Sequence, residues 1–139
     1  MGKARGIIDW FKTCPLVEDV EEFDINQLSA QEMMAGLYKQ PAVTTEKLID
    51  GTVIVTENYY VLFRRAAKVK ADRYENDDFM EAVENWVYEQ ELAENYPDIG
   101  FDVFEIEATN AFYMLERDSD DAVYQLTISI KFMKEAKND

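Results

Sequence analysis

The sequence predicts an α+β fold, in which an antiparallel sheet built from two β-hairpins carries one main amphipathic helix and a short N-terminal helix. Apolar and polar residues alternate over 122–133 at the two-residue period of a strand. An Asp50-Gly51 pair separates two further strand-like segments. Between the hairpins, apolar residues recur at the spacing of one helical face. These residues are Phe79, Met80, Val83, Trp86 and Val87.

The chain begins with a segment typical of a short helix, residues 4–13, which Pro15 ends. One apolar stripe runs along it, because Ala4, Ile7, Ile8, Phe11 and Cys14 recur at helical spacing. The length of 139 residues fits one domain. We therefore expect a single domain over 1–139, with an N-terminal helix within 1–14 and a frayed tail at 134–139.

The first hairpin is expected to pair residues 43–49 with 52–65. An Asp-Gly pair is favoured where both turn residues have positive φ, so the turn is placed at Asp50-Gly51. Residues 32–39 also suit a helical face, but Gly36 and Pro41 weaken a helix there. A short strand is therefore expected over 32–39, and an acidic irregular segment over 16–26.

The main helix is expected to begin at Asp77, with Asn76 as its N-cap and residues 68–74 as a polar connector. Asn95 and Pro97 are expected to end it. The second hairpin is expected to pair 101–115 with 122–133 around a loop at 116–121. In its last strand one face is apolar and the other polar, which predicts that one sheet face is buried. The apolar face comprises Tyr124, Leu126, Ile128, Ile130 and Phe132.

The chain is strongly acidic, with 14 basic against 29 acidic residues and a net charge of −15. A basic nucleic-acid-binding surface is therefore not expected. No apolar run approaches the roughly 20 residues that cross a bilayer, so no membrane association is expected. An acidic surface keeps a protein soluble, meets a basic partner, or lines a passage through which DNA slides without adhering.

No catalytic, cofactor-binding or metal-binding residues are predicted. The chain has no histidine, which removes Ser-His-Asp and Cys-His arrangements and the usual zinc sites. Its one cysteine, Cys14, is interpreted as a small buried residue. Glu105 and Glu107 lie two apart on a strand, so they share one face and are interpreted as solvated rather than as a hydrolytic pair. We expect no enzymatic activity and no cofactor.

Six segments of the sequence resemble the small minor capsid and tail-terminator proteins of long-tailed bacteriophages and prophage-like particles. The most specific is a helix that ends in Trp86–Gln90 and lies between two hairpins. About four fifths of the chain is covered. The segments are FDINQLS (23–29), Tyr38 with Pro41, KLIDG (47–51), YVLFRR (60–65), FMEAVENWVYEQ (79–90) and AVYQLTISI (122–130).

This resemblance implies a virion structural protein located at the tail–neck junction and, during assembly, in the host cytoplasm. Its partners would be copies of itself in a ring, commonly a hexamer, the tail tube protein and a neck or head-completion protein. DNA would pass through the lumen without specific binding. Six copies at −15 each carry −90, which suits such a lumen.

A ring requires two different patches on each subunit. Sheet edges and the apolar N-terminal helix are candidates, as is the basic cluster that begins at Arg64 and Arg65. The residues expected at the interface with the tube or with another copy are Ile7, Trp10, Phe11, Arg64 and Arg65.

Two other functions stay open. The first is a head–tail neck or connector protein, which would share the acidic α+β character. The second is a small acidic protein that mimics DNA and binds a basic host protein, with strong dependence on salt. A carboxylate-based enzyme ranks below both.

Overall fold

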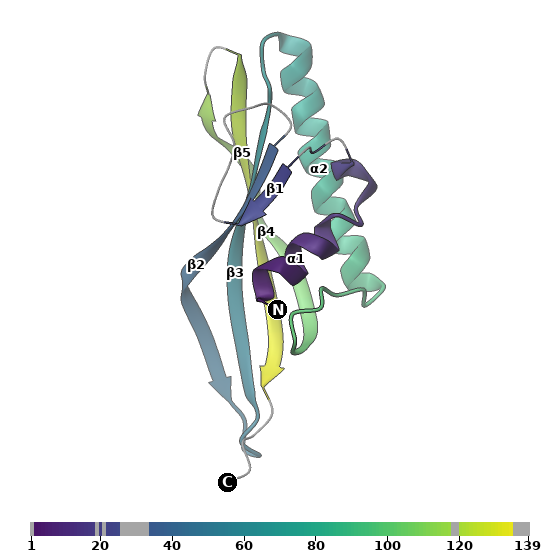
Figure 1. The fold of residues 1–139 in the computed structure, drawn as a ribbon. Coiled ribbons are helices and arrows are strands. Elements are labelled where there is room, and N and C mark those ends of the chain that lie inside the picture. Colours follow the sequence, from purple (N-terminus) through teal and green to yellow (C-terminus); the bar gives the residue numbers. More distant parts are fainter. Residues whose placement is uncertain (1, 19, 21, 26–33, 118–119, 135–139) are drawn as a thin grey trace.

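A five-stranded sheet in the order β1-β2-β3-β5-β4 forms one layer of the computed structural model, and two helices form the other (Figure 1). The structure describes residues 2–18, 20, 22–25, 34–117 and 120–134, without the side chains of 34 and 109–117. One sheet covered by two helices is an α+β arrangement, so the predicted fold class is confirmed. The elements are α1 (Lys3–Phe11), a 3-10 turn (Pro15–Val17), β1 (Glu22–Ile25), β2 (Met34–Lys47), β3 (Val53–Ala66), α2 (Lys70–Leu92), β4 (Asp102–Arg117) and β5 (Asp121–Lys134).

The sheet is mixed, which corrects the expectation of a purely antiparallel one. β1 pairs with β2 in parallel, with Phe23 opposite Ala35, whereas all other pairs are antiparallel. β1 is only four residues long and two of them are acidic, so its apolar pattern is too short to indicate a strand. Phe23 and Ile25 are its two apolar residues, and both pack against the core.

β2 is one strand where the sequence predicts two. Its register with β3 shifts between Lys39 and Val43, and Pro41 lies in that irregular stretch. Because proline has no N–H to donate, it is accommodated in a bulge rather than in a regular ladder. The strand therefore continues past the proline to Lys47, and the strand predicted over 32–39 is its first half as far as the described residues show.

The hairpin turn lies where the Asp-Gly pair predicts, but its conformation differs. Only Gly51 of the pair has positive φ, at 91°. Its N–H donates to the Leu48 carbonyl at 3.0 Å, and the Leu48 N–H donates to the Thr52 carbonyl at 2.8 Å. This is a three-residue hairpin loop in which glycine supplies the left-handed position.

α2 begins about two turns earlier than predicted, so the segment 70–74 is helix rather than connector. Asp72 caps its start, because its carboxylate accepts the N–H groups of Lys68 at 2.9 Å and Val69 at 3.2 Å. Asn76, the predicted N-cap, is instead buried within the helix. The predicted end is confirmed: the helix stops at Leu92, and Glu94 adopts positive φ.

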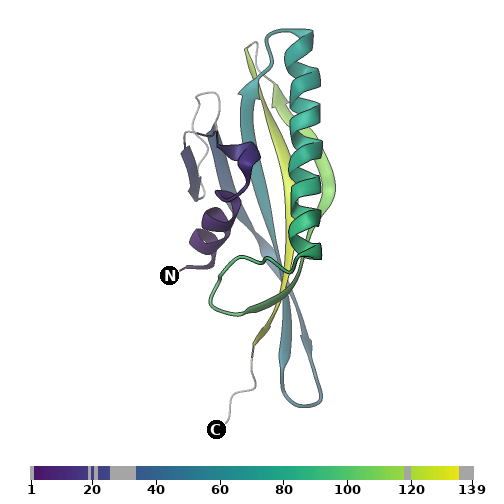
Figure 2. The same ribbon diagram turned by 90° about the vertical axis from the view of Figure 1, so that its right-hand side faces the viewer.

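The buried face of the sheet meets both helices. Inward side chains alternate along β3 and β5, and opposite pairs such as Val61 and Leu126 share this face. The predicted apolar face of the last strand is confirmed as core. α1 and α2 meet over it through Trp10 and Trp86, whose ring centroids are 4.6 Å apart. The opposite sheet face carries no helix in the described part of the chain (Figure 2).

The apolar stripe of α1 is core, which corrects the expectation that Ile7, Trp10 and Phe11 form an interface. Ile7 and Phe11 are 0% exposed and Trp10 is 5% exposed. The Trp10 indole Nε1 donates to the Asn95 carbonyl at 2.8 Å, which ties the helix to the segment after α2. A stripe that packs against another helix of its own chain is not available to a partner.

We expect Gly6→Ala to destabilise the fold by about 3 kcal/mol or more. A Cβ at position 6 would overlap the main-chain carbonyl of Asp98, so α1 would have to move off the segment after α2. Gly2→Ala is the matched control, because nothing lies within 4 Å of a Cβ there, and it should cost less than about 1 kcal/mol. Urea unfolding measures both; equal costs would contradict the close approach at Gly6.

Candidate assembly surface

The hairpin that joins β2 and β3 extends beyond both helices (Figures 1 and 2). We call residues 41–54 the arm. Every residue from 41 to 50 is exposed. The arm bears three large exposed apolar side chains: Val43, Leu48 and, at the tip, Ile49, which is fully exposed. Apolar groups so far from their own core are available for contact with another molecule.

The arm is supported by pairing on both sides of β3. Lys47 pairs with Val53 across the hairpin, and Val53 pairs with Lys134 of β5. The Asp50 carboxylate accepts the Thr52 N–H at 2.9 Å inside the turn. The third strand, β5, follows β3 as far as Val53 and so supports a hairpin that would be only marginally stable with two strands.

A hollow of about 270 Å³ lies at the base of the arm, where α1, β1, β2 and β3 meet. We call it the basal hollow. Its lining is mostly apolar, with two lysines among the lining residues. The lining residues are Gly2, Lys3, Ala4, Ile25, Leu37, Lys39 and Tyr59.

Glu57 lies beside the basal hollow and is only 3% exposed. Its carboxylate accepts hydrogen bonds from Lys3 Nζ at 2.5 Å and from the Tyr59 hydroxyl at 2.7 Å, and Lys39 Nζ lies 3.6 Å away. Burial opposes its charge, but these hydrogen bonds and the two lysines hold the pKa of Glu57 below its usual value. Burial and the neighbouring Glu57 raise the pKa of Tyr59.

Sequence reasoning missed Glu57, although a signal was present. Glu57 occupies the inward register between Val55 and Tyr59, so a charged residue interrupts an otherwise apolar strand face. A buried carboxylate requires partners, and here Lys3 arrives from α1 and Lys39 from β2. The two lysines and one glutamate leave this spot with a local excess of positive charge on an acidic protein.

Arg64 and Arg65 point to opposite faces of β3 and are engaged within the subunit. Arg64 Nη1 lies 3.1 Å from an Asp121 carboxylate oxygen. Arg65 Nε donates to the Asn76 side-chain oxygen at 2.8 Å, and its guanidinium lies 3.8 Å from the Phe79 ring centroid. Both contacts are typical of structural arginines, and a role for either in assembly stays a prediction.

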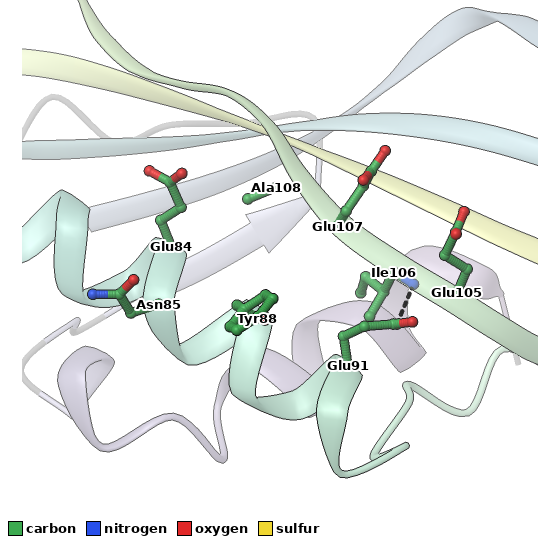
Figure 3. Close-up of a pocket in the computed structure, with 8 residues that line it drawn as sticks. All are labelled: Glu84, Asn85, Tyr88, Glu91, Glu105, Ile106, Glu107 and Ala108. Carbon is green, nitrogen blue, oxygen red and sulfur yellow. Dashed lines mark hydrogen bonds between the residues drawn. The ribbon is translucent and has the colours of Figure 1, made fainter.

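A carboxylate-lined groove of about 380 Å³ lies between α2 and β4 (Figure 3). Four glutamates line it, two from each element, namely Glu84, Glu91, Glu105 and Glu107. Glu91 accepts the Ile106 N–H at 2.8 Å, and Glu105 lies 3.1 Å from Lys131 Nζ. Figure 3 shows Glu105 and Glu107 pointing away from Glu91. The four side chains therefore do not converge on one point.

The predicted solvated face of Glu105 and Glu107 is confirmed, because Glu107 is exposed and the Glu105 side chain is 40% exposed.

Tyr96 lies near several of these glutamates. Burial and the nearby Glu91, Glu94 and Glu105 raise the pKa of its hydroxyl to about 12. Its hydroxyl donates to the Phe104 carbonyl at 3.0 Å. Together with Glu91, it covers main-chain groups at the outer edge of β4.

Two other groups have side chains of a chemically reactive or metal-binding type. Asp77, Asp78 and Glu81 bring their carboxylates within 4.8 Å of one another, but all three are exposed on α2, as on a solvated helix face. Cys14 is buried, as predicted, and burial raises the pKa of its thiol, which disfavours the reactive thiolate.

Neither the models of known protein families nor the curated protein sequences match this chain. Among the described residues, no helix is long and apolar enough to span a membrane.

We expect Glu57→Gln to lower the free energy of unfolding by about 1–3 kcal/mol at pH 7, because charged hydrogen bonds are replaced by neutral ones. The folded-state pKa of Glu57 is lowered, so its contribution is present above the ordinary glutamate value of 4.5 and lost as the pH falls further. The gap between wild type and variant should therefore narrow below pH 4.5 in urea unfolding.

Glu46→Gln is the control for this experiment, because Glu46 is an exposed glutamate on the same strand pair. It should change stability by less than about 0.5 kcal/mol at every pH. A Glu57→Gln effect that stays constant from pH 7 to pH 3 would contradict the ionised, paired state.

Arg65→Ala should destabilise the protein by about 1–3 kcal/mol, because it removes a hydrogen bond to the buried Asn76 and the stacking on Phe79. Arg73→Ala, on the exposed face of α2, should cost less than about 0.5 kcal/mol. Thermal unfolding compares them. An Arg65→Ala protein as stable as wild type would contradict the structural role of Arg65.

Proposed function

We propose that this protein is a structural subunit that assembles into a ring on the last layer of a bacteriophage tail tube, where it ends the tail and joins it to the neck. The observation that carries the proposal is the arm. It places the fully exposed Ile49 in the turn of a projecting hairpin, where no other described residue of the chain covers it.

The arm suits assembly better than it suits a monomer. Ile49 gains nothing from folding of the subunit, since it remains fully in water, and Val43 and Leu48 stay 42% and 37% exposed. Covering apolar surface by a neighbour releases about 25 cal/mol per Å². A projecting arm also supplies one of the two different patches that a closed ring requires.

The charge distribution supports passage of DNA through such a ring. The chain carries −15, and glutamates of α2 and β4 gather at the carboxylate-lined groove. An acidic wall repels phosphate, so DNA would slide along it without adhering. The resemblance of six sequence segments to tail-terminator proteins favours this arrangement over a monomeric DNA mimic, which has no need of an apolar arm.

No catalytic step is part of the proposal. The carboxylates of the groove do not converge, and Glu91 and Glu105 are already engaged by the Ile106 N–H and Lys131. The buried Glu57 is likewise held by Lys3 and Tyr59. These groups stabilise the subunit that the ring is built from.

Native mass spectrometry of the purified protein, alone and with tail tubes, measures whether it assembles. We expect a closed oligomer, a hexamer of the 16.2 kDa chain, that caps the tubes. A protein that stays monomeric and leaves the tubes unbound would contradict the proposal.

Deletion of the gene in a phage that carries it distinguishes a terminator from a neck protein. Loss of a terminator should give over-long or unstable tails, which electron microscopy measures directly. Normal tails that fail to attach to heads would instead indicate the neck position.

A further inference from the structure

We propose that the tip of the arm of one subunit, Ile49 with Asp50, inserts into the basal hollow of the next copy. The inference rests on the proposed function and deepens it, because it names the two patches that would join neighbouring subunits.

The tip combines an exposed apolar side chain with a negative charge. Ile49 is fully exposed at the end of the hairpin, and Leu48 beside it is partly exposed. The next residue, Asp50, is also exposed and brings a negative charge to the tip. An apolar knob beside a carboxylate requires a receptor that is apolar inside and positively charged near its opening.

The basal hollow meets both requirements. Ile25 and Leu37 give it an apolar lining, and Lys3 and Lys39 are the charged residues that line it. Glu57 neutralises one of the two lysines at most, since it carries a single negative charge. The lining therefore keeps a net positive charge that would attract the Asp50 of an incoming tip.

The tip cannot reach the hollow of its own chain. Lys39 lines the hollow, and Lys47 marks the end of β2, eight residues away. At about 3.3 Å per strand residue the two are separated by roughly 26 Å. The pairing of β3 with β2 and β5 keeps the arm extended, as Figure 2 shows. The matching hollow must belong to another molecule.

A second copy of this chain is the occupant that fits. Each copy offers one tip and one hollow on separate surfaces, so the contact is heterologous and can repeat from subunit to subunit. Repetition with rotation closes a ring. The local charges matter here because two copies, each at −15, repel at long range. Opposite charges at the contact would fix which surfaces meet.

The first test is cross-linking between cysteines placed on the two surfaces. A chain with both Ile49→Cys and Ala4→Cys should form a ladder of disulfide-linked multimers under oxidation, seen on a non-reducing gel. The native Cys14 is buried and should not interfere. Ile49→Cys with Glu81→Cys, on the exposed face of α2, is the matched control and should give no ladder.

The second test is Ile49→Asp, which replaces the knob by a charge. Since Ile49 is exposed, the variant should keep its thermal stability but associate about 10- to 100-fold more weakly in analytical ultracentrifugation. Leu92→Asp, at an exposed apolar residue near the end of α2, is the control and should assemble like wild type.

The outcomes separate this contact from the proposed function. A ladder together with loss of assembly in Ile49→Asp supports the contact. A ring that survives Ile49→Asp and gives no ladder overturns the contact and leaves the ring in place. Wild-type protein that stays monomeric even with tail tubes overturns the proposed function and the contact with it.

Discussion

The seating of α1 on the sheet is the constraint on which the rest of the structure depends. Gly6 lets the helix approach the Asp98 carbonyl, and the indole of Trp10 bonds to the segment after α2. From this position Phe11 reaches Trp86, and Lys3 reaches the carboxylate of Glu57. One helix of nine residues thereby completes the core and forms one wall of the basal hollow.

Electrostatics and packing act together at this point. Glu57 is buried where an apolar residue would continue the inward face of β3, and its charge is balanced by lysines from two other elements. Replacement of a buried ion pair by apolar residues is often neutral or stabilising, so such a pair gives little stability by itself. The pair instead fixes the position of α1, because Lys3 holds the start of this helix to β3 at the base of the arm.

The sequence was informative where a pattern is long and local. The alternation of β5 and the helical stripe from Phe79 to Val87 predict their elements and their buried faces, and the Asp50-Gly51 pair locates the turn. The sequence was uninformative where a contact between distant segments decides where an element starts or which of its faces is buried. α2 starts early because Asp72 caps it, although Asn76 looks like the better cap by composition. The stripe of α1 looks like an interface because a sequence does not show that Trp86 covers it.

The basal hollow could not be predicted for a related reason. Its walls come from α1, β1, β2 and β3, and β1 is too short to leave a pattern. The tip is different: because Ile49 is excluded from the folding core, its identity is scarcely constrained by the folding of its own chain. Residues at this position can therefore be exchanged without disturbing the core, so the surface that the tip presents can diverge between related proteins while the scaffold stays intact.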